Sequence, residues 1–377
     1  PIYFNYLASS AYVSEVNYLA FWGYATSAAT IITALLGPVL GTVPDFRGWK
    51  KRLFLISLLT GACGCIVLGF LSSWIWFLLI FILAKAAYSL SLIFYDSMLT
   101  DVTTEERMDE VRPADTLGYI EACIPFLASL ALALFYETLG LTMKTAMGIA
   151  FLLIAIWWIC FSVPLLKSYR QIHCIEEHHH AYPPAFAASD TSSEIKKKPE
   201  SAFLLIAFFF YIDGVYTIID MATAYGTALG LDTTGLLLAL LVTQIVAFPA
   251  ALLFGRLSGK YKNAVLIRIC IGAYFLIALY GITLKEQYQF WILAVCVGIF
   301  QGAIQSLSAP ISPDHPGGTL GEYFGIYDIC GKGASFLGTT LVSAMSQLTG
   351  NMNLGVGSLA IMFLIGFFFF LKTEKIS

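Results

Sequence analysis

Eleven apolar runs, each of about 20 residues, constrain the fold of this 377-residue chain more than any other feature. At 1.5 Å of rise per residue, a helix of that length crosses the ~30 Å hydrocarbon core of a bilayer. Barrel strands would be shorter and would alternate between apolar and polar residues. The runs therefore predict an all-α, polytopic membrane protein. The predicted spans lie at roughly 22–43, 53–72, 74–95, 117–136, 145–166, 202–224, 233–254, 263–283, 289–310, 321–347 and 354–372.

Composition excludes several function classes. Hydrophobic residues make up 58% of the chain, and its net charge of −3 comes without the basic stripe that binds nucleic acid. There is no phosphate-binding loop, nucleophile–base pair or cofactor loop, so we expect neither an enzyme nor a cofactor. The acidic and histidine run at 176–180 lies in a loop without a scaffold, and we expect a solvated segment rather than a metal site.

Basic residues predict the orientation of the spans. Lysine and arginine concentrate in alternate short loops, whereas the loops on the opposite side hold only Lys144 and Lys285. The lysine-rich loops are therefore predicted to be cytoplasmic, and so is the C-terminus. The polar segment 167–201 contains a proline pair and "KKKP", which is typical of a cytoplasmic linker.

This linker divides the chain into two halves, 1–166 and 202–377. The sequence before Gly41 is repeated before Gly255, which favours two parallel six-helix halves and twelve spans. Fewer residues precede Gly41 than separate Ala202 from Gly255, so we expect the first span to be incomplete in this chain. Glycines within spans, such as Gly64 and Gly69, are expected to allow close helix packing.

A charged loop, "GTVPDFRGWKKR", follows the first complete span. We expect Gly41 and Gly48 to permit a tight reversal, and Lys50 and Lys51 to hold the loop on the inner side of the membrane. Asp45 has no such simple explanation.

These residues resemble the major facilitator superfamily. Its signature between spans two and three, Gly-x-x-x-Asp-x-x-Gly-x-[Lys/Arg]-[Lys/Arg], is filled by Gly41, Asp45, Gly48, Lys50 and Lys51. Within the superfamily the chain resembles the autophagy-related vacuole effluxer family and its bacterial relatives. The resembling stretches include "WGYATSAATIITALLGPVLG", "IFYDSMLTDV", "FFYIDGVYTIIDMATAYG", "TQIVAFPAALLFGRLS", "QGAIQSLS" and "EYFGIYDICGK".

The resemblance implies a transporter that moves small solutes by alternating access between two six-helix bundles. It implies a central cavity lined by spans one, four, seven and ten, which favours Lys85, Asp213 and Gln301 as cavity residues. It further implies that Asp45 faces the positive N-terminal end of span eleven and acts as a gating latch. For the cargo, the resemblance points to amino-acid efflux.

Ionisable residues within spans are expensive and suggest function or pairing. Asp213 and Asp220 are seven residues apart, so they share a helical face with Tyr216 and Thr217. Asp213 is a candidate proton carrier, and the alternative is a structural hydrogen bond to a neighbouring helix. Lys85 lies in the middle of span four.

Other polar positions allow two interpretations. Asp328 and Lys332 in span eleven are four residues apart, which allows them to pair with each other. Three amides, those of Gln301, Gln305 and Gln244, suit a solute's amino or carboxyl group, but they also suit hydrogen bonds between helices.

The sequence therefore predicts a secondary transporter of a small polar solute, an amino acid in the first instance, with proton coupling left open. Residue chemistry alone also admits a sugar, a nucleoside or a drug-like cation. The rivals are a lipid or amphiphile transporter and a non-transporting receptor or scaffold of the same fold. We expect a monomer surrounded by membrane lipids, in the plasma (inner) membrane of a bacterium or a vacuole-type membrane of a eukaryote.

Overall fold

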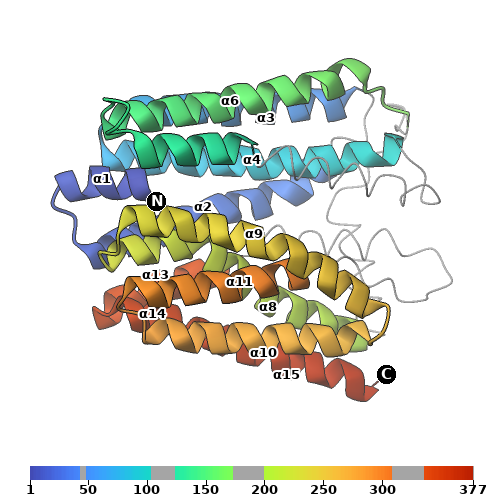
Figure 1. Ribbon diagram of the computed structural model, residues 1–377. Coiled ribbons are helices and arrows are strands. Elements are labelled where there is room, and N and C mark those ends of the chain that lie inside the picture. Colours follow the sequence, from blue (N-terminus) through green and yellow to red (C-terminus); the bar gives the residue numbers. More distant parts are fainter. Residues whose placement is uncertain (43–47, 103–123, 173–198, 308–334, 377) are drawn as a thin grey trace. The chain divides into compact units, whose positions relative to one another are not determined.

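The computed structural model describes residues 1–42, 48–102, 124–172, 199–307 and 335–376. In these ranges the secondary structure is helical and contains no β-strand, as the apolar runs predict. The helices shown in Figure 1 are α1 (Ile2–Ser10), α2 (Glu15–Thr42), α3 (Trp49–Phe70), α4 (Trp74–Val102), α6 (Met143–Ser168), α8 (Pro199–Ala228), α9 (Thr233–Ser258), α10 (Asn263–Ile282), α11 (Gln287–Leu307), α13 (Phe336–Thr349), α14 (Met352–Gly357) and α15 (Leu359–Ile376).

Nine helical segments in the described ranges are long and apolar enough to cross a membrane. They match nine of the predicted spans, most closely at α10, where the prediction of 263–283 meets a helix at Asn263–Ile282. The predicted span 117–136 is described only in part, as the apolar helix Ile124–Phe135. Of the predicted span 321–347, the described part is α13. The chain is therefore an all-helical, multi-pass membrane protein.

Large apolar side chains remain exposed along the spans. Examples are Leu35 on α2, Phe70 on α3 and Ile245 on α9, which are each more than 60% exposed. Such exposure is unfavourable in water, but lipid tails are as apolar as leucine, so it carries no cost in a bilayer. These faces fit contact with lipid.

Internal contacts divide the chain into two compact units. The N-terminal unit comprises 29–184 and contains α3, α4, α6 and the second part of α2. The C-terminal unit comprises 1–28 and 185–377, and so adds α1 and the first part of α2 to the helices from α8 onward. The boundary between the units therefore falls within α2. The division at 1–166 and 202–377 stays a prediction.

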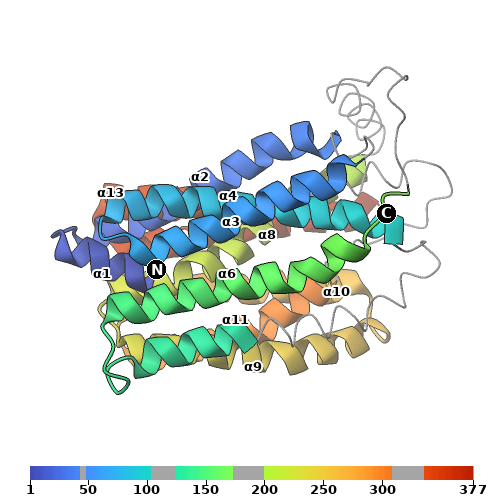
Figure 2. The same ribbon diagram turned by 90° about the horizontal axis from the view of Figure 1, so that it is seen from above.

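In the N-terminal unit, α3 packs against both α4 and α6 (Figures 1 and 2). Small residues bring these helices together: a Cβ atom on Gly64 would lie 2.8 Å from the Cβ of Ala84, and one on Gly69 would lie 2.8 Å from the Cα of Gly148. The prediction that these glycines allow close helix packing is confirmed.

In the C-terminal unit, α9 and α11 run side by side (Figure 1). Gly298 and Gly302, one turn apart on α11, lie directly on the backbone of α9, and a Cβ on Gly302 would lie 2.2 Å from the carbonyl oxygen of Ala247. Helix α8 packs against α13 and α15. These contacts place α8, α9, α11 and α13 around the polar groups described next.

Candidate functional site

A cavity of about 60 Å³ lies in the C-terminal unit between α8, α9 and α11. Its polar lining residues are Thr243 and Gln244 from α9 and Gln301 from α11. The remaining lining residues are apolar: Ile218, Ile219, Ala222, Ala239, Leu240, Phe290, Leu293, Ala294 and Val297. The structure thus brings together two of the three glutamines that the sequence singled out. A small cavity with convergent amides in apolar walls has the make-up of a ligand site.

Asp213 lies on another side of α8, against the start of α13. Its Oδ1 accepts hydrogen bonds from the backbone N–H of Gly338 (2.7 Å) and the hydroxyl of Thr217 (3.3 Å). Its Oδ2 accepts one from the backbone N–H of Leu337 (3.0 Å). The first N–H groups of a helix have no partner within the helix, and here a carboxylate from a different helix takes that place.

Asp220 meets the same helix two turns further along α8. Its Oδ2 accepts a hydrogen bond from the hydroxyl of Ser335 (3.1 Å), and its backbone carbonyl accepts one from the indole N–H of Trp22 (3.1 Å). As the seven-residue spacing predicts, both acids face one neighbour. We call this set the α13 anchor: Asp213, Thr217, Asp220, Ser335, Leu337 and Gly338.

Polar side chains continue from the α13 anchor to the first part of α2. The hydroxyls of Ser27 and Thr339 share a hydrogen bond of 2.6 Å, and the hydroxyl of Thr340 donates to Ser27 (3.0 Å). Nearer the end of α13, the Tyr24 hydroxyl donates to the Gln347 side chain (3.0 Å). Hydrogen bonds of this kind hold helices together within membranes.

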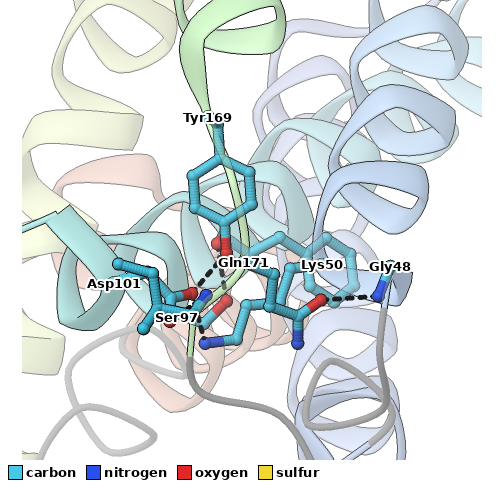
Figure 3. A network of polar contacts seen from close by, with 8 residues as sticks. Gly48, Lys50, Ser97, Asp101, Tyr169 and Gln171 are labelled. Atoms are coloured by element: carbon cyan, nitrogen blue, oxygen red, sulfur yellow. Dashed lines mark hydrogen bonds and ion pairs between the residues drawn. The ribbon is translucent and has the colours of Figure 1, made fainter.

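The N-terminal unit contains a buried ion pair at the start of α3 (Figure 3). The Lys50 ammonium lies 2.8 Å from Oδ2 of Asp101 at the end of α4. The same oxygen accepts a hydrogen bond from the hydroxyl of Tyr169, and Oδ1 accepts one from the backbone N–H of Ile172 (3.2 Å). Beside them, the backbone N–H of Gly48 donates to the Gln171 side chain (2.7 Å). The cluster joins the loop signature to the segments that follow α4 and α6.

Two residues of the loop signature differ from the sequence-based expectation. Lys50 was expected on the inner surface, but it lies in the first turn of α3 and is only 4% exposed, because Asp101 supplies a charge partner in the interior. Gly41 was expected in the reversal, but it lies in the last turn of α2. Gly48 does take a left-handed conformation, with φ of +80°. Lys51 is exposed.

The other candidates have different positions. Lys85 on α4 belongs to the N-terminal unit and is partly exposed, and Tyr216 on α8 is also partly exposed. Gln305 lies on α11, but its side chain is outside the described set. Asp45, Asp328, Lys332 and the run at 176–180 lie outside the described residues. Within the described ranges, no group of three or more histidine, cysteine or acidic residues is placed to bind a metal.

Sequence reasoning did not identify Asp101, Tyr169 or Ser335 as partners of the charged groups. Asp101 is the final acid of "IFYDSMLTDV", and its position at the end of a span was an available signal. Tyr169 and Ser335 carry no local pattern, and only the packing of distant segments reveals them.

Comparison with known proteins agrees with this architecture. Residues 8–115 and 113–375 match the family described as vacuole effluxer Atg22 like. The chain is also 36% identical over 376 residues to an uncharacterised MFS-type transporter, YxiO, of Bacillus subtilis (strain 168), and the match covers 97% of this chain and 87% of the relative.

Solved structures of transporters share the fold. The nucleoside transporter NupG superposes with a TM-score of 0.68 at 15% identity, covering 98% of this chain and 94% of NupG. A bacterial homologue of the human lysosomal transporter Spinster, inward-facing and unoccupied, gives 0.60 at 14%, covering 99% and 97%. The Escherichia coli fucose:proton symporter FucP gives 0.55 at 12%, covering 95% and 97%.

At these identities the solved structures show the fold alone, which is the major facilitator fold. Transporters of this fold generally need no cofactor. The family match extends over nearly the whole sequence, from residue 8 to residue 375. The chain therefore belongs to the Atg22-like vacuole effluxer family of MFS-type transporters, which are not enzymes.

Proposed function

We propose that this protein transports a small polar solute, an amino acid, by alternating access, in the efflux direction and with proton coupling. The observation that supports this proposal most is the cavity at which Gln244 of α9 and Gln301 of α11 meet. An amide offers donors and an acceptor, so two amides are able to orient either the ammonium or the carboxylate group of a zwitterion. Lys85 is the proposed partner of the solute's carboxylate, and Asp213 is the proposed proton-carrying group.

The size of the cavity limits what this subsite binds. About 60 Å³ holds a few water-sized groups, which fits one polar end of an amino acid rather than the whole molecule. We therefore propose that the cavity is one polar subsite and that it widens as the solute enters. The mainly apolar walls increase the strength of each hydrogen bond made there, because the local dielectric constant is low.

The positive-inside pattern supports a cytoplasmic linker and C-terminus. The similarity to a Bacillus protein supports the plasma membrane, with a vacuole-type membrane as the equivalent location in a eukaryote. We propose a monomer in contact with lipids, with Gly41, Asp45, Gly48, Lys50 and Lys51 as the gating segment.

A binding screen followed by transport measurements tests the proposed cargo. A ligand that binds only the folded state raises the melting temperature, so purified protein is screened against amino acids, nucleosides, sugars and lysolipids. We expect amino acids to give the largest shifts, and labelled amino acid to exchange across proteoliposomes. Gln301→Leu and Gln244→Leu should each weaken binding, whereas the lipid-facing control Ile245→Met on α9 should not. Shifts confined to another solute class would overturn the amino-acid assignment.

One observation favours amphiphiles as a second candidate cargo. A smaller cavity of about 20 Å³ has entirely apolar side chains apart from the ring of Tyr225, and it shares Ile218, Ala222, Phe290 and Leu293 with the amide-lined cavity. Such a neighbour suits an acyl chain. Lysolipid binding that survives Gln301→Leu would favour this alternative.

A further inference from the structure

The start of α13 is an unusual feature of the C-terminal unit. The sequence predicts one continuous span over 321–347, yet α13 begins at Phe336, after Ser335 with φ of +81°. A serine in this conformation is strained and persists only where surrounding contacts hold it. Here the contacts are the two acids of α8, since Asp213 binds the N–H groups of Leu337 and Gly338, and Asp220 binds the hydroxyl of Ser335.

We propose that Asp213 and Asp220 are positioning residues that hold the start of α13 on α8, and that a proton on Asp213 releases this contact. This inference rests on the proposed proton coupling and deepens it. The proton then acts on transport through the position of α13, without contact between Asp213 and the solute.

The hydrogen bonds of Asp213 make protonation and anchoring compete. An ionised carboxylate only accepts hydrogen bonds, and both oxygens of Asp213 are occupied by donors: Oδ1 by Gly338 and Thr217, Oδ2 by Leu337. A protonated oxygen becomes a donor and faces another donor. Because Asp213 is 0% exposed, no water is available to resolve that clash. A proton on Oδ2 must therefore displace the N–H of Leu337.

The converse also follows from the surroundings of Asp213. Every described hydrogen-bonding partner of its carboxylate is neutral, and three of them belong to the α13 anchor's backbone and hydroxyl donors. The described titratable groups of neighbouring helices are Asp220 and Tyr216 on α8, and Cys270 and Tyr274 on α10; α13 itself contributes none, and Phe363 of α15 covers this part of α8 at Gly214. The charge of Asp213 thus depends on the dipoles at the start of α13.

Movement of α13 has consequences beyond α8. The hydroxyls of Thr339 and Thr340, one turn into α13, bind Ser27 of α2. The indole of Trp22 on the same part of α2 binds the backbone of Asp220. Release of the α13 anchor therefore loosens a polar connection between α8, α13 and the first part of α2, which gives the proton a route to a larger rearrangement.

Hydrogen exchange at the two anchored amides tests the inference. The full-length protein in nanodiscs is measured over a pH series, and exchange at Leu337 and Gly338 is expressed relative to the intrinsic chemical rate at each pH. We expect protection to fall by about tenfold per pH unit once Asp213 takes up its proton. Asp213→Asn, which has no titrating group, should give low protection that does not change with pH.

Two variants serve as controls. Asp232→Asn alters an acid that caps a different helix, since Asp232 accepts the N–H of Gly235 at the start of α9, and the pH dependence at α13 should be unchanged. Thr217→Val removes one hydroxyl donor but keeps the carboxylate and both amides, so the pH dependence should persist. The wild-type titration stands even where Asp213→Asn does not fold.

The outcomes separate this inference from the proposed function. Protection at Leu337 and Gly338 that stays constant with pH in the wild type would overturn the inference, and gradient-driven uptake in the same preparation would leave proton coupling intact. Uptake that ignores the pH gradient would overturn the proposed proton coupling. In that case a pH-dependent α13 would still show a proton-sensitive anchor.

Discussion

Two buried carboxylates, one in each unit, are held in opposite ways. Asp101 in the N-terminal unit lies against the permanent positive charge of Lys50. Asp213 in the C-terminal unit receives only neutral donors, and two of them are backbone N–H groups at the start of α13. The first arrangement fastens two helices by a charge pair. The second ties the charge of an acid to the position of a helix, which is what a coupling device requires.

The comparison also separates stability from transport. Loss of the cation beside Asp101 leaves an uncompensated charge in the interior, so its main effect should be on folding. Loss of the charge at Asp213 should mainly change how transport responds to protons. The predictions below are ordered from the largest expected effect to the smallest.

Lys50→Met should destabilise the protein by about 3–5 kcal/mol, because it strands the buried carboxylate of Asp101. The double variant Lys50→Met with Asp101→Leu should recover most of the loss, since two apolar side chains replace the pair. Denaturant unfolding in detergent measures both. A single variant within about 0.5 kcal/mol of the wild type would show that the pair contributes nothing.

Tyr169→Phe should destabilise by about 2 kcal/mol, because the Tyr169 hydroxyl donates to the charged Asp101. The comparison variant is Tyr261→Phe, whose ring is 59% exposed on the surface of the other unit and which should be neutral. Equal stability of the two variants would contradict the assigned hydrogen bond.

The same tyrosine predicts a pH effect. Burial, with the hydrogen bond and charge of Asp101, raises the pKa of the Tyr169 phenol above its ordinary value of about 10. Stability linked to this group is fully present below pH 10 and is lost as the pH rises towards the folded-state pKa. Unfolding measured at neutral and alkaline pH should show a smaller alkaline loss in Tyr169→Phe than in the wild type.

Asp213→Asn should cost only about 1–2 kcal/mol, because the amide oxygen still accepts one N–H of α13 while the other loses its partner. This is less than the expected cost of Lys50→Met, although Asp213 is the more deeply buried group. A loss as large as that of Lys50→Met would place Asp213 with Asp101 as a structural acid.

Gly48→Ala should destabilise by about 1 kcal/mol, since Gly48 has φ of +80° and no atom crowds its open side. Gly255→Ala is the matched control, because Gly255 lies within a helix with free space around it. An unchanged unfolding midpoint for Gly48→Ala would show that the left-handed turn is not required.

The sequence predicted the spans because bilayer thickness fixes the length of an apolar run, as at 263–283 and α10. It predicted the shared face of Asp213 and Asp220 because helical periodicity depends only on spacing. It did not predict what that face meets, or the start of α13 at Phe336, because tertiary contacts hold Ser335 in its conformation. Lys50 was misplaced for the same reason: its partner, Asp101, lies 51 residues away in the sequence.

The central claim is that a proton at Asp213 drives solute movement in this MFS-type transporter. The most direct measurement is accumulation of the solute identified by the binding screen, in proteoliposomes with an imposed pH gradient, by the wild type, Asp213→Asn and the control Asp232→Asn. We predict that the wild type and Asp232→Asn accumulate solute, whereas Asp213→Asn exchanges it without accumulation. Full gradient-driven accumulation by Asp213→Asn would contradict the claim.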